Sequence, residues 1–164
     1  VHQLVERLPG LALGASEEVS RSLSFEVDKE TATRALAEAC RVIEAPGLAS
    51  FFAPGTLGEV PISGVYNNRR LHGSIDRLVF APDRIIALDF KTNRVIPDRP
   101  GDCPEGILQQ MGAYLHLLRQ IYPETMIEVG IVWTGSASYM PLPDMLVLEA
   151  LARAPDLDDD QAAT

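Results

Sequence analysis

The sequence has little cysteine and no long apolar run. Its two cysteines, Cys40 and Cys103, stand 63 positions apart and outside any Cys-x-x-Cys pair, which argues against a zinc or iron–sulfur site. No segment approaches the ~20 consecutive apolar residues that a membrane span needs, and no basic-then-apolar leader opens the chain. We therefore expect no membrane partner, and a reducing cytoplasm is the natural compartment.

A nucleotide-binding motif is also missing. No Gly-x-x-x-x-Gly-Lys-Ser/Thr loop occurs in the 164 residues, so this chain carries no P-loop ATP site of its own. The first residue is Val1, in what reads as the middle of a helix. We expect the chain to be a fragment of a longer protein.

Basic residues are scarce relative to acidic ones. The 14 Lys and Arg face 23 Asp and Glu, for a net charge of −9, whereas a protein that simply coats DNA would show a basic surface. Part of the excess lies in residues 154–164, which we expect to form an acidic, disordered tail. Carboxylates that bind a divalent cation are partly neutralised by it, so contact with nucleic acid at a metal site remains open.

Hydrophobic periodicity predicts one mixed α/β domain over residues 1–153, with a central sheet covered by helices. Asp102 and Glu105 have the spacing of a capping box before one of the helices. Expected helices cover residues 1–13, 16–28, 31–44, 104–120 and 144–153, with a helical turn at 48–52, and expected strands cover 57–65, 70–80, 84–91, 126–133 and 139–141.

Two aspartates are expected to face each other in the hairpin formed by the second and third strands. Pro82 and Asp83 indicate the turn. If the turn centres between them, opposed residue numbers sum to 165, and Asp76 lies across from Asp89 with Cβ atoms roughly 4.5–5.5 Å apart. Lys91, two positions beyond Asp89, projects from the same face. A turn of three residues would break this alignment.

Opposed carboxylates repel each other, so this pair needs compensation. The alternate residues of 84–91 are apolar, which suggests that both faces of the hairpin are covered and that unpaired charge there would be expensive. A divalent cation held by Asp76 and Asp89 would explain the pair, because such ions prefer carboxylate and carbonyl oxygen. Lys91 would then orient or activate a metal-bound water, or stabilise charge on a phosphate. A salt-bridge triad in which Lys91 joins the two aspartates is the alternative.

These strands resemble the core of the PD-(D/E)xK nucleases, in the version carried at the C-terminus of RecB and AddA. The matching residues are Gly73, Asp76, Arg77, Asp89, Phe90, Lys91 and Thr92. Ile75 stands where the family name has proline. Residues 87–122 are especially similar to the AddA subunit of alphaproteobacterial type. The resemblance implies a restriction-endonuclease-like fold.

Three further motifs carry the resemblance in the same order. His2, with Glu6 four positions on, is similar to the helical histidine motif of these nucleases. Glu59 is similar to their first-strand glutamate, and Gln110 with Tyr114 to their glutamine–tyrosine motif. Each also has a simpler reading: a surface histidine, a solvated strand residue, and a tyrosine that packs in the core.

The resemblance implies roles for these residues. A catalytic Mg²⁺ or Mn²⁺ would be held by Asp76, Asp89, the Phe90 carbonyl and a His2 nitrogen, and Lys91 would be the catalytic lysine. Gln110 and Tyr114 would position the strand or the metal shell. The residues expected in the catalytic site are thus Asp76, Asp89, Lys91, Glu59, Gln110 and Tyr114.

The resemblance also implies a parent protein. It would be an ATP-dependent, UvrD/Rep-like DNA helicase whose nuclease end acts as an exonuclease in double-strand break repair and recombination, beside an AddB-type partner subunit. The alternatives are a catalytically silent module of the same fold that binds DNA or a partner subunit, and a structural domain with a buried ion triad.

Overall fold

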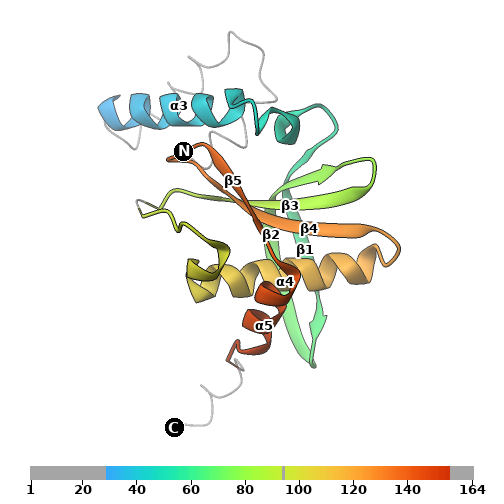
Figure 1. Ribbon diagram of the computed structural model, residues 1–164. Helices are drawn as coiled ribbons and strands as arrows, with labels where there is room; N and C mark the ends of the chain where they lie inside the picture. Colours follow the sequence, from blue (N-terminus) through green and yellow to red (C-terminus); the bar gives the residue numbers. More distant parts are fainter. Residues whose placement is uncertain (1–28, 94, 156–164) are drawn as a thin grey trace.

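A single mixed sheet forms the centre of the computed structural model, which describes residues 29–93 and 95–155 (Figure 1). The strand order is β1-β2-β3-β4-β5; β3 and β4 are parallel and all other neighbours are antiparallel. The strands are β1 (Leu57–Tyr66), β2 (Arg69–Phe80), β3 (Arg84–Lys91), β4 (Met126–Trp133) and β5 (Ser138–Leu142), and the helices are α3 (Lys29–Glu44), α4 (Glu105–Ile121) and α5 (Asp144–Ala152), with 3₁₀ turns η2 (Ala49–Phe52) and η3 (Pro100–Asp102).

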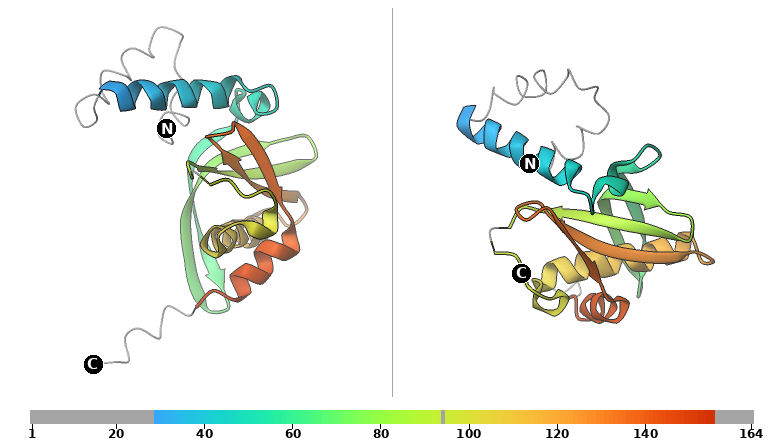
Figure 2. Two further views of the ribbon diagram at one scale, coloured as in Figure 1. Left: turned by 60° about the vertical axis from the view of Figure 1, so that its left-hand side comes forward. Right: turned by 45° about the horizontal axis from the view of Figure 1, so that its top comes forward.

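Helices cover both faces of the sheet. In Figures 1 and 2, α3 and η2 lie on one side, and α4 with α5 lies on the other. Apolar residues accordingly form two buried clusters, one with α4 and α5 and one with α3 and η2. Residues of β3 alternate between them: Ala87 joins the first cluster, and Leu88 and Phe90 join the second. A strand buried on both faces reads as a nearly continuous apolar run, as residues 85–90 do.

The predicted mixed sheet flanked by helices is confirmed, and the described strands, α-helices and η2 lie within two residues of their expected bounds. The helices expected at 1–13 and 16–28 and the acidic residues 156–164 lie outside the described residues. In the part of the chain that is described, no helix is long and apolar enough to cross a membrane.

The predicted capping box is wrong. Both Asp102 carboxylate oxygens accept hydrogen bonds from the Arg99 guanidinium, at 3.0 and 3.2 Å. Pro104 is the residue that precedes α4, and no side chain of the described residues caps the helix there. Glu105 instead accepts a hydrogen bond from Arg153 at 3.0 Å. The carboxylates of Asp102 and Glu105 therefore bind arginines instead of capping the start of α4.

The second strand belongs to two ladders of different length. Its pairs with β3 sum to 165, as predicted, from Phe80↔Ile85 to Arg77↔Leu88, where that ladder ends. Its pairs with β1 continue to Tyr66↔Arg69. Residues 69–75 of β2 therefore pair with β1 but not with β3. We call these residues the separated half of β2.

Both strands depart from regular geometry at the same level. Glu59 has a φ of 49°, and by the β1–β2 register it lies opposite Asp76. Ile75 and Leu78 both enter the cluster on the α4 side, although residues three apart in a regular strand face opposite sides. Side-chain alternation therefore shifts by one at Asp76 and Arg77, where β2 separates from β3.

Candidate active site

Asp76 lies where β2 stops pairing with β3. Its side chain accepts the β3 hydrogen bond that a backbone carbonyl of β2 would otherwise accept. The Phe90 N–H donates to Asp76 Oδ2 at 2.7 Å. In an unbroken ladder with this register, Phe90 would instead face Ile75. The side chain of Asp76 is buried, with 7% of its residue surface exposed. A carboxylate that accepts from a backbone amide is a strong acceptor, so Asp76 ties the two strands together where their backbones part.

Asp89 and Lys91 share one face of β3, as their spacing predicted. Lys91 Nζ lies 2.7 Å from Asp89 Oδ2 and also donates to Gln110 Oε1 at 3.2 Å. Asp89 is 2% exposed, whereas the Lys91 side chain is 24% exposed. The carboxylate is thus fixed inside the fold, and the ammonium group remains within reach of a bound molecule.

Gln110 and Tyr114 extend this contact from β3 back to β2. Gln110 Nε2 donates to the Tyr114 hydroxyl at 2.9 Å, and that hydroxyl donates to the Ser74 carbonyl at 2.7 Å. Burial raises the pKa of Tyr114 above its ordinary value, so the hydroxyl keeps its proton at neutral pH. A side chain at Gly73 would collide with the Tyr114 ring, because a Cβ at that position would lie 2.9 Å from a ring carbon. Gln110 and Tyr114 therefore fix the distance between α4 and the separated half of β2.

The donor set suits a hard divalent cation. Each carboxylate offers about four acceptor positions, and the contacts above use part of that capacity. The Phe90 N–H points to the β2 edge of β3, so its carbonyl points to the same edge. Within the described residues, no group of three or more His, Cys, Asp and Glu side chains could hold a metal ion. Two carboxylates with a carbonyl and waters match Mg²⁺, which usually keeps several waters.

Thr134 supports the end of β3 and was not predicted as a site residue. Its N–H donates to the Lys91 carbonyl at 3.0 Å, and the residue is fully buried. Its hydroxyl donates to the Glu38 carboxylate of α3. Lys91 and Glu38 lie 43 and 96 positions from Thr134 in the sequence, so no local spacing could have indicated these contacts.

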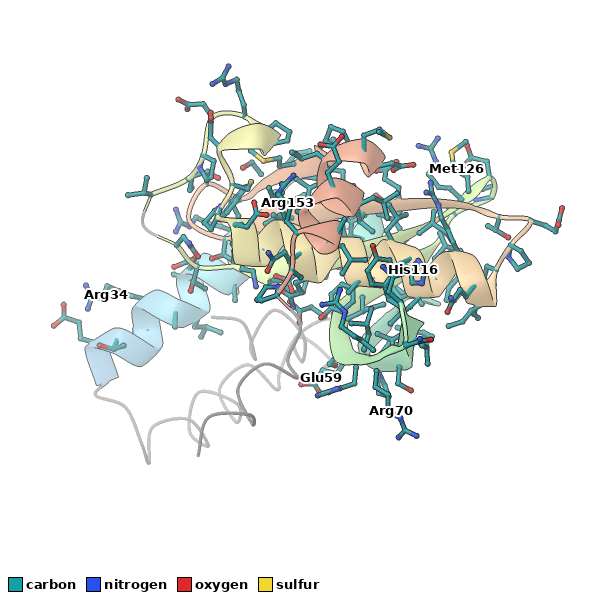
Figure 3. All side chains as sticks on the ribbon, turned by 90° about the horizontal axis from the view of Figure 1, so that it is seen from below. Arg34, Glu59, Arg70, His116, Met126 and Arg153 are labelled. Atoms are coloured by element: carbon teal, nitrogen blue, oxygen red, sulfur yellow. The ribbon has the colours of Figure 1, made fainter. Side chains whose placement is uncertain are left out.

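The remaining predicted site residues have different outcomes. Glu59 is exposed, and Figure 3 shows it at the outer margin of the β1–β2 hairpin. Its backbone lies opposite Asp76, but its contribution to the site stays a prediction. His2 lies outside the described residues, and its role as a ligand also stays a prediction. The structure thus brings together Asp76, Phe90, Asp89, Lys91, Gln110 and Tyr114.

Comparison with known proteins shows the family of the chain. A family model described as the PD-(D/E)XK nuclease superfamily matches residues 1–163. No curated protein matches the chain.

Two solved structures are similar at low identity. One, provisionally named an exonuclease, from Eubacterium rectale, is 14% identical with a TM-score of 0.47; the match covers 71% of this chain and 48% of that one. The protein SSO0001 is 13% identical with a TM-score of 0.40, covering 92% and 72%. The chain thus spans about half the length of the first structure. At these TM-scores neither likeness carries an argument.

Proposed function

The chain belongs to the PD-(D/E)XK nuclease superfamily, and on that premise we propose that it is a metal-dependent nuclease that hydrolyses DNA phosphodiester bonds. One observation carries the proposal. Two buried carboxylates, Asp76 and Asp89, lie where β2 leaves β3: Asp76 accepts from the N–H of Phe90, the residue after Asp89, and the partly exposed Lys91 ammonium lies 2.7 Å from Asp89. Carboxylates for a cation and a cationic group for a phosphate are what phosphodiester hydrolysis requires.

Asp76, Asp89 and the Phe90 carbonyl would hold the cation, which we propose is Mg²⁺ or Mn²⁺, with His2 as a nitrogen ligand. Such a cation supplies Lewis-acid polarisation of the phosphate and lowers the pKa of water. The fit rests on the hard oxygen donors and their burial. Burial also lowers the local dielectric, which strengthens the attraction between these carboxylates and a cation.

Lys91 would place its ammonium group against a phosphate oxygen. Asp89 and Gln110 hold that group from two directions, so little side-chain freedom remains to be lost when the phosphate arrives. Gln110 and Tyr114 would act by positioning Lys91 and the separated half of β2. Glu59 would contribute from β1, opposite Asp76.

We further propose the parent protein that the sequence resemblance implies. The nuclease would be the end of an AddA-type helicase–nuclease that acts as an exonuclease in double-strand break repair and recombination, in the cytoplasm, with an AddB-type partner. The similarity of residues 87–122 to AddA supports this assignment. A helicase would deliver the single strand to the site, which is consistent with a nuclease chain of net charge −9 that has few basic residues of its own.

The test is a titration of the chain with Mg²⁺ and Mn²⁺, with thermal stability and cleavage of single-stranded DNA as readouts. We expect the cations to raise the melting temperature, because ligands that bind the folded state stabilise it, and to support cleavage. Asp89→Ala should lose both responses. Asp83→Ala is the matched control, because Asp83 lies exposed in the adjoining turn and pairs with Arg84.

The outcomes separate the candidate functions. Metal stabilisation without cleavage, in the isolated chain and in its full-length parent complex, would support a silent binding module. Absence of any metal response in both would leave the buried ion triad and contradict the proposed nuclease.

A further inference from the structure

A groove opens between the separated half of β2 and the start of α4. It encloses about 460 Å³, which is within the range of small-ligand sites. Its lining comes from β2, α4, α5 and the chain after α5, and includes Leu71, Gly106, Gln109, Gln110, Ala113 and Tyr114. The separation of β2 from β3 therefore forms both the candidate active site and the space beside it.

Three contacts hold the walls of this groove in place. Arg69 of β2 donates to the carbonyls of Ala154 and Pro155 at 3.1 and 3.0 Å. Arg153 pairs with Glu105 in the first turn of α4 at 3.0 Å, and Figure 3 shows Arg153 beside α4. The ends of α5 and α4 and the edge of β2 are thus joined before any ligand binds, which lowers the ordering cost of binding.

The groove is continuous with the candidate active site. Gln110 and Tyr114 line it, and Gln110 is the direct partner of Lys91. The chain is acidic overall, yet no Asp or Glu of the described residues lines the groove. The Leu71 and Ala113 side chains offer an apolar surface against which a base could lie, and the Gln109 amide offers a polar contact for its edge. These features fit a neutral base and sugar attached to an anionic backbone.

We propose that this groove seats one nucleoside of a single-stranded nucleic acid, next to the phosphate that the active site binds. The assignment rests on the proposed nuclease function. A space of this volume accepts one base with its sugar, whereas a paired and stacked duplex would first have to open. Unstacked bases of single strands are commonly held by stacking and edge contacts of this kind.

Gly106 provides the means to test the proposal. A Cβ added to Gly106 would meet no heavy atom of the described residues within 4 Å, so the residue faces open space on the α4 wall. Replacement of a helical glycine also improves helix propensity. Gly106→Phe should therefore fill the groove without loss of folding stability. Gly101→Phe is the matched control, because Gly101 is equally open but does not line the groove.

The experiment measures cleavage of a fluorescent single-stranded oligonucleotide in Mg²⁺ and its binding by anisotropy in Ca²⁺, for the full chain and each variant. We expect Gly106→Phe to raise KM and Kd about ten-fold, as when a stacked base is lost. Gln109→Ala, which removes an amide from the α4 wall, should raise both several-fold, and Gly101→Phe should change neither. A blunt duplex should bind at least about ten-fold more weakly than the single strand.

Each contrary result has a distinct meaning. If the wild-type chain cleaves but folded Gly106→Phe and Gln109→Ala keep wild-type KM and Kd, the subsite is overturned and the nuclease stands. Equal binding of duplex and single strand would overturn the single-strand assignment. If the wild-type chain neither cleaves nor binds the oligonucleotide, the proposed function fails and the subsite with it.

Discussion

The two halves of β2 differ in what satisfies their backbone. From Arg77 to Phe80 the strand is paired with β1 or β3 in register and contributes apolar side chains to the core. From Arg69 to Ile75 it has β1 alone as a neighbour among the described strands, and the Ser74 carbonyl is bonded by Tyr114. Buried polar groups need partners. Where the β2–β3 ladder ends, Tyr114 of α4 and the Asp76 side chain provide the hydrogen bonds that the neighbouring strand no longer makes.

We therefore expect the paired half of the hairpin to contribute mainly to folding stability and the separated half mainly to the chemistry of the site. In the paired half, removal of a side chain mainly removes packing. In the separated half, polar side chains hold an opening in the sheet, and their removal should change chemistry more than folding. The charged residues Asp76, Asp89 and Lys91 all lie at the boundary, where two strands are close enough to share a ligand but no longer share hydrogen bonds.

The largest expected effect is the loss of cleavage in Asp76→Asn. The amide keeps the shape of the side chain, and its oxygen can still accept from the Phe90 N–H, but the negative charge is gone. We expect single-turnover DNA cleavage to fall by more than about a hundred-fold, while the free energy of unfolding without metal changes by less than about 1 kcal/mol. Cleavage within ten-fold of wild type would contradict the role assigned to the boundary.

The converse variant is Leu88→Ala in the paired half. Leu88 is fully buried in the cluster shared with α3, and truncation of such a leucine costs about 2–5 kcal/mol. Urea unfolding should show this loss, while kcat of the folded enzyme stays within about two-fold. Leu57→Ala, at a residue 48% exposed on β1, is the control and should cost less than about 1 kcal/mol. A kcat loss in Leu88→Ala as large as that of Asp76→Asn would remove the distinction between the halves.

A smaller effect is expected for Gln110→Leu, which removes the contacts to Lys91 and Tyr114. We expect kcat to fall about ten-fold, as when a group that orients an active-site residue is removed, with KM nearly unchanged. Gln110→Glu keeps an acceptor for Lys91 and should recover part of kcat. Gln120→Leu, near the other end of α4, should keep wild-type kcat. A purely structural role would instead lower stability without rescue by glutamate.

The smallest expected effect concerns Tyr114 and alkaline pH. Burial raises the pKa of Tyr114 in the folded chain, so the folded state holds this proton more tightly than the unfolded state. The contribution to stability is present below about pH 10, the ordinary pKa of tyrosine, and is lost as pH rises through the folded value. Tyr114→Phe should lower stability by about 1 kcal/mol at pH 7 and flatten the decline above pH 10. An unchanged decline would show that Tyr114 is not its source.

The sequence predicted the parts of the fold that depend on local pattern. The Pro82-Asp83 turn set the register of β2 and β3 correctly, because hairpin pairing follows from the length of its turn. Alternation in β3 correctly placed Asp89 and Lys91 on one face. The termination of that ladder at Arg77 was not predictable in this way, because it depends on contacts between β2 and α4 that lie far apart in sequence.

The same limit applies to the site. Asp76, Asp89 and Lys91 were predicted from one hairpin, and Gln110 with Tyr114 from resemblance, and the structure joins them by direct contacts. Thr134 is a single threonine after a strand, and its role follows only when β4 lies beside β3. The spacing of Asp102 predicted a helix cap, but in the structure its carboxylate accepts from Arg99 instead. A local motif competes with every charged neighbour that folding brings near.

The most direct test of the proposed metal site is a crystal structure from crystals soaked in Mn²⁺, with anomalous scattering used to locate the ion. We expect one strong peak within about 2.0–2.3 Å of a carboxylate oxygen from each of Asp76 and Asp89. We also expect Lys91 to lie beside Asp89 and the Phe90 carbonyl to face the ion. A structure that lacks a peak there at saturating Mn²⁺, with Lys91 lying between the two carboxylates, would contradict the proposed metal site.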